Sequence, residues 1–552
     1  MAFMMSSPSF GRHGMVATSQ TQATQVGVDI LRKGGSAVDS AIAANAMLSL
    51  SEPHMCGPGG DLFAMVWDPR AGELAGLNAS GRSPRSLSCD ALRKKVGGTG
   101  LIPGRGPLAL SVPGAVDGWC VLHERYGRLP FADVFAPAVR HARAGTPIGA
   151  RTAEMWRHAA RNVLDDPVLE GMVAPFSETY LIDGEAPRPG QTFRNPALAD
   201  TFEAIGRDGR TAFYEGAGGE RIVSYQQSLG GFLSADDFAA SHSEWVTPVT
   251  TNYRGYDVYQ MPPNGQGMCV LQMLNVLEGY PLGEFGLDSA EYWHAFIETK
   301  KLSFADRARY YADPAFAEVP VSALIDKSYA EVRRSLIEPQ TAGTDYPHGE
   351  VAIPGGDTTY LTVADRDGMM VSLIQSIFSP FGAGLVPPGT GFGLQCRGAG
   401  FTLEPGHPNV YEPGKRPFHT IIPAFVLKRG KPWLSFGVMG ADMQPQGQVQ
   451  VLVNMIDFGL DPQAAGDAPR MRHFGGSQPN GQRFDGLGEV QYEAGIDAAV
   501  IENLRRRGHR MVPIEDWITG FVGGYQAIRY DARDGVYVGA SETRFDGCAS
   551  GC

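Results

Sequence analysis

One stretch near the middle of the chain limits the possible folds more than any other. Gly355-Gly356-Asp357 is followed by Thr358 to Ala364, a run of β-branched and apolar residues whose side chains alternate with the period of two of a strand. Arg366-Asp367-Gly368 supplies turn residues, and a second strand pattern runs from Met369 to Ser376. The pattern predicts a β-hairpin, and therefore a fold that contains an antiparallel sheet.

The position of the turn predicts which residues face each other across this hairpin. If Arg366 to Gly368 form a three-residue loop, Thr358 lies opposite Ser376. Opposed residues have Cβ atoms about 4.5–5.5 Å apart, so the two hydroxyls could form a hydrogen bond. A two-residue loop at Asp367-Gly368 would shift this register by one residue.

Thr358 admits two interpretations. Hairpins rich in threonine are common, and on that interpretation the stretch is purely structural. On the other, a cut between Asp357 and Thr358 makes Thr358 an N-terminal nucleophile whose own α-amino group is the base. Gly355-Gly356 would let the backbone bend before the scissile bond. Ala342 to Pro354 has several Gly and Pro residues and little periodicity, so we expect an exposed connection that ends at the processing site.

Composition excludes several classes of function. The 552 residues are 43% hydrophobic and 19% charged, with a net charge of −12, which is typical of a globular protein and shows no basic stripe for nucleic acid. No apolar run predicts a transmembrane helix, and Met1 to Ser7 lack a signal-peptide pattern, so we expect a cytoplasmic location and no membrane contact. The seven cysteines show no metal-binding spacing, and we expect neither a metal nor an organic cofactor.

Periodicity predicts helices and strands on both sides of the central hairpin. Helical patterns cover Ala23 to Lys33 and Ala37 to Leu50, and a hairpin pattern joins Leu62–Trp67 to Glu73–Asn78. The glycine-rich Cys56–Asp61 is not a phosphate loop, because it follows a helix, precedes a strand and lacks the lysine. We interpret it as a turn that lets backbones pack closely, and we expect two layers of strands with helices outside.

Two further turns are candidates for function. Arg82 follows the first hairpin, where its guanidinium could bind a carboxylate or could be a solvated loop residue. Gly437 to Asp442 follows another predicted strand, and its small residues leave main-chain N–H groups accessible, as an oxyanion hole requires.

Eight short segments follow one another along almost the whole chain: Ala23–Leu31, Gly57–Phe63, Ser111–Gly114, Tyr253–Tyr256, Phe304–Arg307, Thr358-Thr359, Lys415–Pro417 and Gly539–Ser541. Their order and spacing resemble the γ-glutamyltranspeptidase family of N-terminal nucleophile hydrolases nearly end to end. The resemblance implies an α+β fold, an αββα sandwich of two stacked antiparallel sheets flanked by helices. It also implies an autocatalytic cut that leaves 1–357 as a large subunit and 358–552 as a small subunit, which form a heterodimer that could pair further.

The resemblance assigns catalytic roles to four residues. Thr358 matches the family's nucleophile, and Ser376 matches its second hydroxyl, which agrees with the hairpin register derived above. Gly440-Ala441 stands where the family has a Gly-Gly oxyanion pair. Exchange of glycine for alanine keeps the main-chain N–H group, so both hydrogen-bond donors are retained.

The acyl pocket departs from the family pattern. Ser80 stands at the position of the family's carboxylate-binding arginine, with Arg82 two residues on. The family's Asn-Gln-x-x-Asp stretch reads Cys396-Arg397-Gly398-Ala399-Gly400, so a cation replaces the glutamine and the anion for the substrate ammonium is absent. Phe378 replaces an asparagine, and His419-Thr420 replaces a Ser-Ser pair. These changes resemble the branch that includes class IV cephalosporin acylases.

The sequence therefore predicts an amide hydrolase or acyltransferase with its acyl-enzyme on Thr358, acting on small-molecule γ-glutamyl-like or glutaryl-type amides. Because Arg397 suits a bare carboxylate and repels an ammonium, des-amino acyl groups are expected to be better substrates, unless Arg397 pairs with a local acid instead. Two alternatives stay open. One is a true glutathione hydrolase that uses Arg82, and the other is a non-catalytic family member that acts as a binding protein.

Overall fold

The computed structural model describes residues 6–97, 100–344, 346, 357–476, 478–482, 486–516 and 522–552, and it describes Asp357 and Thr358 by their backbone alone. Gly355-Gly356 and most of the predicted connection from Ala342 to Pro354 lie outside these residues. Within the described ranges, no helix is long and apolar enough to cross a membrane.

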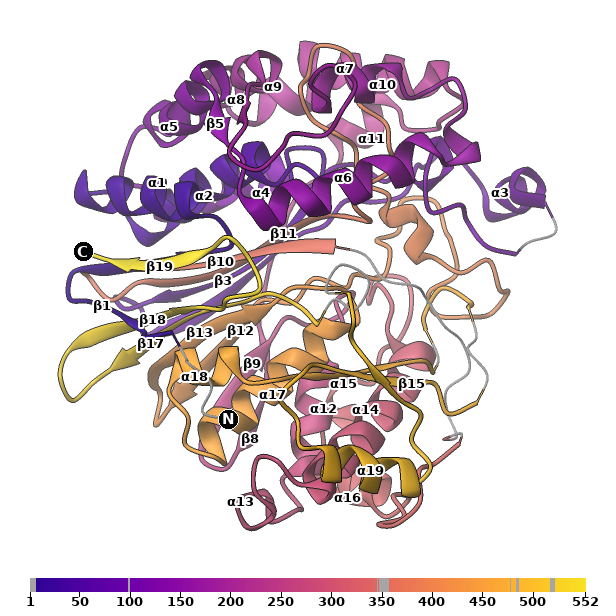
Figure 1. The fold of residues 1–552 in the computed structure, drawn as a ribbon. Helices are drawn as coiled ribbons and strands as arrows, with labels where there is room; N and C mark the ends of the chain where they lie inside the picture. The colour runs from indigo at the N-terminus through magenta and orange to yellow at the C-terminus, as the bar shows by residue number, and fades with distance from the viewer. Residues whose placement is uncertain are drawn as a thin grey trace.

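Two seven-stranded antiparallel sheets lie face to face in the middle of the molecule (Figure 1). The first sheet has the order β19 (Cys548–Gly551), β2 (Gly14–Thr18), β10 (Asp357–Asp365), β11 (Met370–Phe378), β3 (Asp61–Asp68), β4 (Glu73–Ala79) and β7 (Glu244–Val246). The second has the order β1 (Ser9–Gly11), β18 (Val536–Ser541), β17 (Tyr525–Asp531), β13 (Lys431–Val438), β12 (Ala424–Lys428), β9 (Tyr256–Gln260) and β8 (Val249–Tyr253).

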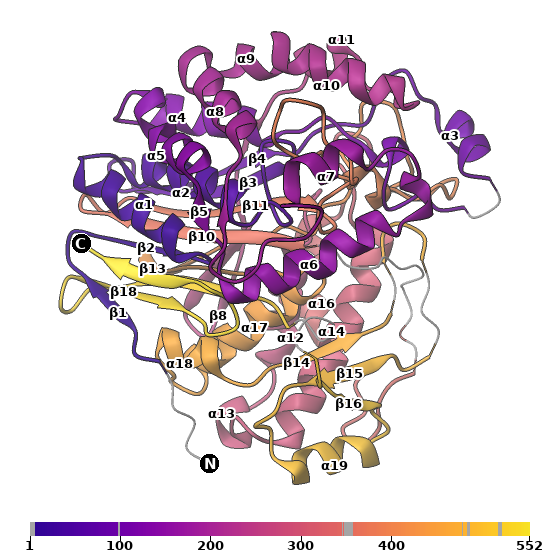
Figure 2. The ribbon, with the colours of Figure 1, turned by 45° about the horizontal axis from the view of Figure 1, so that its top comes forward.

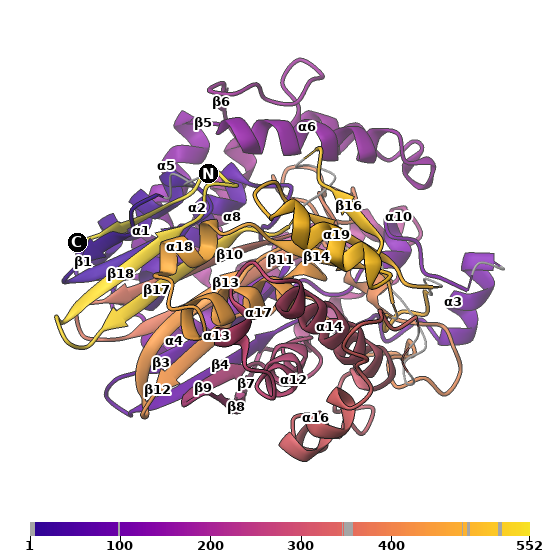
Figure 3. The same cartoon turned by 60° about the horizontal axis from the view of Figure 1, so that its bottom comes forward.

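Helices cover the outer face of each sheet, which makes four layers (Figure 1, Figure 2). The first sheet is covered by a large group near the top of Figure 1: α1 (Thr21–Arg32), α2 (Ala37–Ser51), α4 (Ala115–Tyr126), α5 (Phe131–Ala144), α6 (Ala150–Leu164) and α8 (Pro196–Asp208). The second sheet is covered by α12 (Met268–Leu277), α14 (Ala290–Tyr310), α17 (Met443–Ile456) and α18 (Pro462–Asp467), which come forward in Figure 3. The predicted α+β, αββα architecture is confirmed.

Smaller elements complete the two helical sides. They are α3 (Cys89–Val96), α7 (Ala174–Tyr180), α9 (Arg210–Tyr214), α10 (Ala217–Ser228), α11 (Ala235–Ala239), α13 (Leu282–Phe285), α15 (Val321–Leu324), α16 (Lys327–Arg334), α19 (Ala498–Arg506), and the short strands β5 (Thr146–Pro147), β6 (Thr192–Phe193), β14 (Met471–Phe474), β15 (Glu489–Tyr492) and β16 (Met511–Pro513).

A hydrophobic core fills each space between layers. Phe63 and Tyr360 of the first sheet meet Phe425 and Ile528 of the second in the middle layer. Larger cores lie between each sheet and its own helices. Burial of apolar surface on both faces of both sheets is the main stabilising contribution to such a fold.

Helix α2 illustrates how the local sequence sets an element. The Ser36 side chain accepts a hydrogen bond from the N–H of Asp39, and the Asp39 carboxylate accepts one from the N–H of Ser36, so the helix starts at a capping box. All fifteen residues of this helix are buried. The small Ala and Ser residues between the large ones let α2 pack against the sheet and against α1, α4 and α5 together.

The central hairpin has the predicted three-residue loop. Gly368 adopts φ +89°, and the Asp365 carboxylate accepts hydrogen bonds from the N–H groups of Asp367 (2.9 Å) and Met369 (3.1 Å). The register is as predicted from Ala364 back to Thr359, which pairs with Gln375. The glycine-rich turn before Asp61 also packs as predicted: a Cβ on Gly60 would lie 2.6 Å from the carbonyl oxygen of Ser376.

Candidate functional site

The register of the hairpin shifts at Thr358. Asp357 pairs with Phe378 and Thr359 with Gln375, so Ser376 and Ile377 together lie opposite the single residue Thr358. Such a β-bulge re-aims side chains and is common beside active sites. The predicted simple pairing of Thr358 with Ser376 is therefore replaced by a bulge that still places the two residues on neighbouring strands. The Thr358 side chain lies outside the described residues, and its role stays a prediction.

Ser376 and Phe378 end strand β11 in a constrained conformation. Ser376 is fully buried, and its Oγ accepts a hydrogen bond of 2.8 Å from the N–H of Phe378. Phe378 has φ +80°, a conformation that costs a residue with a Cβ about 1–3 kcal/mol and is often found at functional sites. The turn carries the Phe378 ring beneath Arg397, whose guanidinium carbon lies 4.7 Å from the ring centroid.

Glu52, which the sequence analysis did not identify, holds the start of strand β10. Its carboxylate accepts hydrogen bonds from the hydroxyls of Thr359 (2.8 Å) and Ser19 (2.7 Å) and from the amide of Gln20 (2.7 Å). Burial raises the pKa of Glu52, and the three hydrogen bonds oppose that shift. A buried acid at the end of α2 thus fixes the residue next to the proposed nucleophile.

The predicted oxyanion pair lies at the turn between β13 and α17. Gly440 has φ +115° and Ala441 has φ +49°, and their carbonyl oxygens accept from the N–H groups of Met443 and Gln444. Among the described residues, the N–H groups of Gly440 and Ala441 have no acceptor, so both could donate to a substrate oxygen.

The oxyanion turn is held from behind by a buried polar network. The Gln266 side chain donates to the carbonyl oxygen of Ala441 (2.8 Å), and Arg307 donates to Gln266 (2.5 Å) and to Asp442 (2.8 Å). This scaffold keeps the turn in place without using its N–H groups.

Arg397 is a fully buried cation, and two of its three guanidinium nitrogens have no hydrogen-bond partner among the described residues. Its Nη1 donates to the hydroxyl of Thr420 at 2.9 Å, while its Nε and Nη2 have no hydrogen-bond partner among the described residues. Burial lowers the pKa of Arg397 to about 10, against the favourable field of Asp61, so the side chain is still charged at neutral pH. The predicted residues Phe378, Arg397 and Thr420 therefore meet at one place.

His419 lies in the same cluster and brings Asp61 into it. The imidazole packs 5.3 Å from the Phe63 ring, and neither ring nitrogen has a hydrogen-bond partner among the described residues. Its Nε2 lies 3.6 Å from Oδ2 of Asp61. Burial, with the fields of Arg397 and Arg416, holds the pKa of His419 well below its ordinary value, so the imidazole is neutral and this contact is no ion pair.

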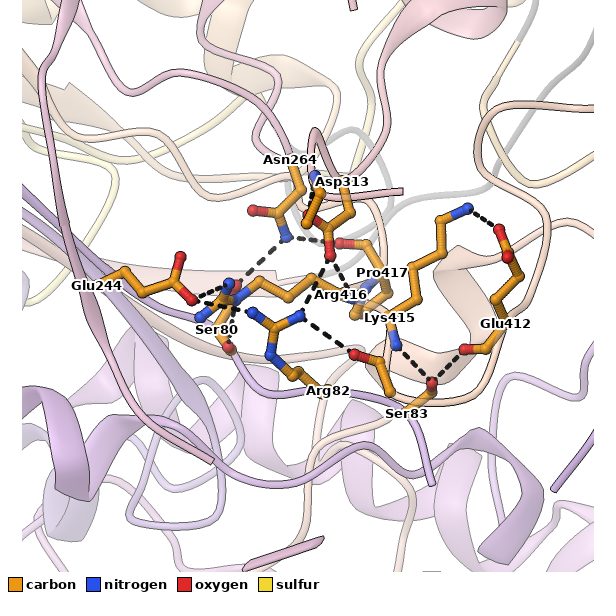
Figure 4. Close-up of polar contacts among 12 residues, drawn as sticks. Ser80, Arg82, Ser83, Glu244, Asn264, Asp313, Glu412, Lys415, Arg416 and Pro417 are labelled. Atoms are coloured by element: carbon orange, nitrogen blue, oxygen red, sulfur yellow. Dashed lines mark hydrogen bonds and ion pairs between the residues drawn. The ribbon is translucent and has the colours of Figure 1, made fainter. Parts of the chain in front are cut away.

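Arg82 does not join this cluster. Figure 4 shows Arg82 and Arg416 converging on Glu244, at 2.9 Å each, with Asp313 3.5 Å from Arg82. Arg82 also donates to the carbonyl oxygen of Gly414 (3.1 Å). Both terminal nitrogens of the Arg82 guanidinium therefore have partners within the protein. The sequence analysis considered a solvated loop residue or a ligand for a substrate carboxylate, and Arg82 has neither arrangement here.

One cluster in the described part of the chain has the composition of a metal site. His294 and Glu298 of α14 and His509 are buried with their ligand atoms close together. The imidazoles are hydrogen-bonded to each other at 2.8 Å, and Lys301 donates to Glu298 at 2.6 Å. Because the Lys301 ammonium already occupies the carboxylate, we assign no metal to these residues.

The chain is similar over nearly its whole length to proteins named as hydrolase-like and acylase proenzymes. The family model described as gamma-glutamyltranspeptidase matches residues 23–552. The glutathione hydrolase-like YwrD proenzyme of Bacillus subtilis (strain 168) is 38% identical over 554 residues, covering 99% of this chain and 100% of that protein. The acylase ACY 1 proenzyme of Pseudomonas sp. (strain SE83) is 34% identical over 547 residues, covering 98% and 94%.

Comparison with solved structures identifies relatives of the same kind as the sequence comparison. The structure of cephalosporin acylase from Bacillus halodurans matches with a TM-score of 0.90 and 40% sequence identity, covering 100% of this chain and 98% of that one. The matches by family, sequence and fold all extend along nearly the whole chain. The chain therefore belongs to the γ-glutamyltranspeptidase family and is an enzyme of the N-terminal nucleophile amidohydrolase type.

Proposed function

We propose that the chain cleaves itself between Asp357 and Thr358 and then hydrolyses amides through an ester on Thr358. The free α-amino group of Thr358 takes the proton of its hydroxyl and returns it to the leaving amine. Ser376 orients the nucleophile, and the N–H groups of Gly440 and Ala441 hold the tetrahedral oxygen, an effect worth about 3–4 kcal/mol per donor. Water then releases the acyl group, and an amine acceptor would complete a transfer.

The free edge of Arg397 supports an acyl group that ends in a carboxylate. The Nε–H and Nη2–H of a guanidinium point in one direction and match the two oxygens of a carboxylate. In Arg397 these are the donors without partners among the described residues, while Thr420 and the Phe378 ring hold the rest of the group in place. A buried cation with unused donors is costly unless a ligand fills them. Glutaryl and γ-glutamyl amides both supply such a carboxylate.

Replacement of the nucleophile tests the first part of this proposal. Thr358→Ala should leave a single uncut chain without amidase activity, because one hydroxyl serves both maturation and turnover. Thr358→Ser should still mature. In the native protein, N-terminal sequencing of the smaller fragment should begin Thr-Thr-Tyr-Leu. A native chain that stays intact on a denaturing gel after long incubation would favour the alternative of a binding protein, and an active Thr358→Ala variant would refute the mechanism.

Replacement of the buried arginine tests the second part. Arg397→Gln should lower kcat/KM for glutaryl- and γ-glutamyl-p-nitroanilide by about 100-fold or more, because the substrate carboxylate loses its charged partner. Acetyl-p-nitroanilide, which has no carboxylate, should be affected much less. Arg82→Gln is the matched control and should leave all three rates nearly unchanged. The opposite result, a large loss in Arg82→Gln alone, would favour the glutathione hydrolase alternative that uses Arg82. Self-cleavage of each variant on a gel reports that it has folded.

A further inference from the structure

A buried carboxylate that the family's motif does not predict, that of Asp61, lies in the electrostatic environment of Arg397. Asp61 begins strand β3 and pairs in register with Ser376. Its Oδ1 accepts hydrogen bonds from the N–H groups of Gly81 (2.8 Å) and Gly114 (3.2 Å), which fix the orientation of the carboxyl group. Its Oδ2 is buried and has no hydrogen-bond partner among the described residues. Oδ1 of Asp61 is thus hydrogen-bonded to the backbone, and Oδ2 can accept a hydrogen bond from a ligand.

Asp61 and Arg397 have opposite charges but do not satisfy each other. Within the described part of the chain, the unused atoms are Oδ2 of Asp61 and Nε and Nη2 of Arg397, and all three are buried. The field of Arg397 is the largest of the influences that favour the ionised form of Asp61, so the two groups lie in one electrostatic environment. Burying both charged groups with unpaired atoms costs free energy, which a ligand with a positive and a negative group would recover.

The groups that face Asp61 are consistent with this role. His419 presents a neutral ring 3.6 Å away, whose two nitrogens have no partner among the described residues, and it can accept a hydrogen bond or donate one. Arg397 and Arg416 supply positive fields from two other segments, and Ser376 is the cross-strand neighbour. A carboxylate, an imidazole and a guanidinium therefore come together next to the end of strand β11.

We infer that Asp61 is the specificity-determining residue that accepts an ammonium group carried by the acyl group beside the carboxylate bound to Arg397. The inference rests on the proposed amide hydrolysis and on Arg397 as the carboxylate site. The chemical class is an amide whose acyl part ends in an α-amino acid head group. The sequence argument for des-amino substrates assumed that the missing aspartate at Gly400 left no anion, and Asp61 supplies one from a different strand.

The acidity of Asp61 makes this selectivity depend on pH. Burial raises the pKa of Asp61 to about 7, although Arg397, the two backbone hydrogen bonds and Arg416 lower it. Below this value the carboxyl group is mostly neutral and offers an ammonium little attraction, and above it the group is an anion. Preference for the α-amino substrate should therefore increase as the pH rises through about 7. The α-amino base of Thr358 affects both substrates equally and cancels in their ratio.

The ratio of kcat/KM for γ-glutamyl- and glutaryl-p-nitroanilide, measured between about pH 6 and about pH 8, tests the inference. In the native enzyme the ratio should rise with pH. In Asp61→Asn it should fall by about tenfold or more at the alkaline end and lose its pH dependence. Asparagine keeps an oxygen for Gly81 and Gly114, and self-cleavage reports that the variant has folded. His419→Gln should change the ratio less and keep its rise with pH.

Binding of the product acids gives a second readout that does not depend on turnover. The native enzyme should gain more thermal stability from L-glutamate than from glutarate at about pH 8, and Asp61→Asn should reverse that order. A ratio that is flat with pH and unchanged in Asp61→Asn, with both substrates hydrolysed, would overturn the inference while leaving the proposed function intact. Failure to hydrolyse either substrate would instead reject the proposed function.

Discussion

Thr359 shows how the residue after the proposed nucleophile is held. Its hydroxyl donates to the buried Glu52, which also binds Ser19 and Gln20. Losing one donor leaves a buried carboxylate oxygen short of a partner, a change worth about 1–3 kcal/mol. Because Thr359 adjoins the bulge at Thr358, that change should move the backbone that carries the nucleophile.

Thr359→Val should therefore slow self-cleavage and amide hydrolysis by about tenfold, which corresponds to about 1.4 kcal/mol. Thr362→Val is the matched control, because Thr362 is buried in the same strand and loses hydrogen bonds to Val371 (2.9 Å) and Ser435 (2.7 Å). It should lower the midpoint of thermal unfolding to a similar extent but leave the cleavage rate nearly unchanged. Equal slowing in both variants would mean that strand stability, rather than the contact with Glu52, limits the rate.

Among the elements, the glycine turn before β3 and the hairpin β10–β11 are packed backbone to backbone. A Cβ on Gly60 would meet the carbonyl oxygen of Ser376 at 2.6 Å and its carbonyl carbon at 3.0 Å. Neither atom can move without moving strand β11. Gly72, in the loop between β3 and β4, has φ +67°. A Cβ added to Gly72 would meet no described atom within 4 Å, so a substitution there would be disfavoured by the backbone conformation alone.

These two glycines give a prediction about the hairpin. Gly60→Ala should abolish or strongly reduce self-cleavage, because the added methyl group displaces Ser376. Gly72→Ala should cost about 1–2 kcal/mol of stability from the left-handed conformation and leave cleavage normal. Thermal unfolding and the time course of the two bands on a denaturing gel distinguish the cases. Normal cleavage in Gly60→Ala would show that the close approach is not needed for the site.

Local rules predicted the parts of the site that depend on neighbouring residues. Gly368 and Asp365 set the loop length, so the register could be derived as far as Thr359. The bulge at Thr358 could not, because the turn residues determine the register next to the loop and carry no signal for an extra residue further along β11. The oxyanion role of Gly440-Ala441 remains a prediction, although both N–H groups are without an acceptor among the described residues, as that role requires.

Asp61 and Glu52 were missed because their partners are distant in the sequence. Thr359 is 307 positions from Glu52, and the Asp61 neighbours Arg397 and His419 come from segments more than 300 positions away. A charged residue at the head of an apolar strand such as Leu62–Val66 is the one signal that could have indicated Asp61, since unpaired acids are rarely buried. These contacts of the site are therefore set by the tertiary structure and cannot be derived from neighbouring residues in the sequence.

At the scale of the whole molecule, residues before and after Thr358 share both sheets. In the first sheet, β10 lies between β2 and β11, and β11 pairs with β3. In the second, β12 pairs with β9, and β18 pairs with β1. A cut before Thr358 would leave every one of these ladders in place, and neither fragment would contain a complete sheet or a complete core.

The two fragments should therefore stay together after processing. On a sizing column in native buffer, the mature protein should elute at the same volume as the uncut Thr358→Ala chain, whether both are single precursors or both pair further. The two fragments should separate only under denaturing conditions. Elution of a free small fragment without denaturant would contradict the interleaved arrangement. Calibrating the column with proteins of known mass also shows whether the mature heterodimer pairs further.

The interleaved sheets also determine which fragments can be partners. In an ordinary heterodimer, subunits dissociate and find new partners at rates set by concentration, so mixed populations scramble. Here separation would require breaking strand ladders in both sheets at once, which amounts to unfolding. Each small fragment should stay bound to the large fragment made from the same precursor molecule until the protein unfolds. Mixing a variant that is inactive through its large fragment with one that is inactive through its small fragment should therefore not restore activity.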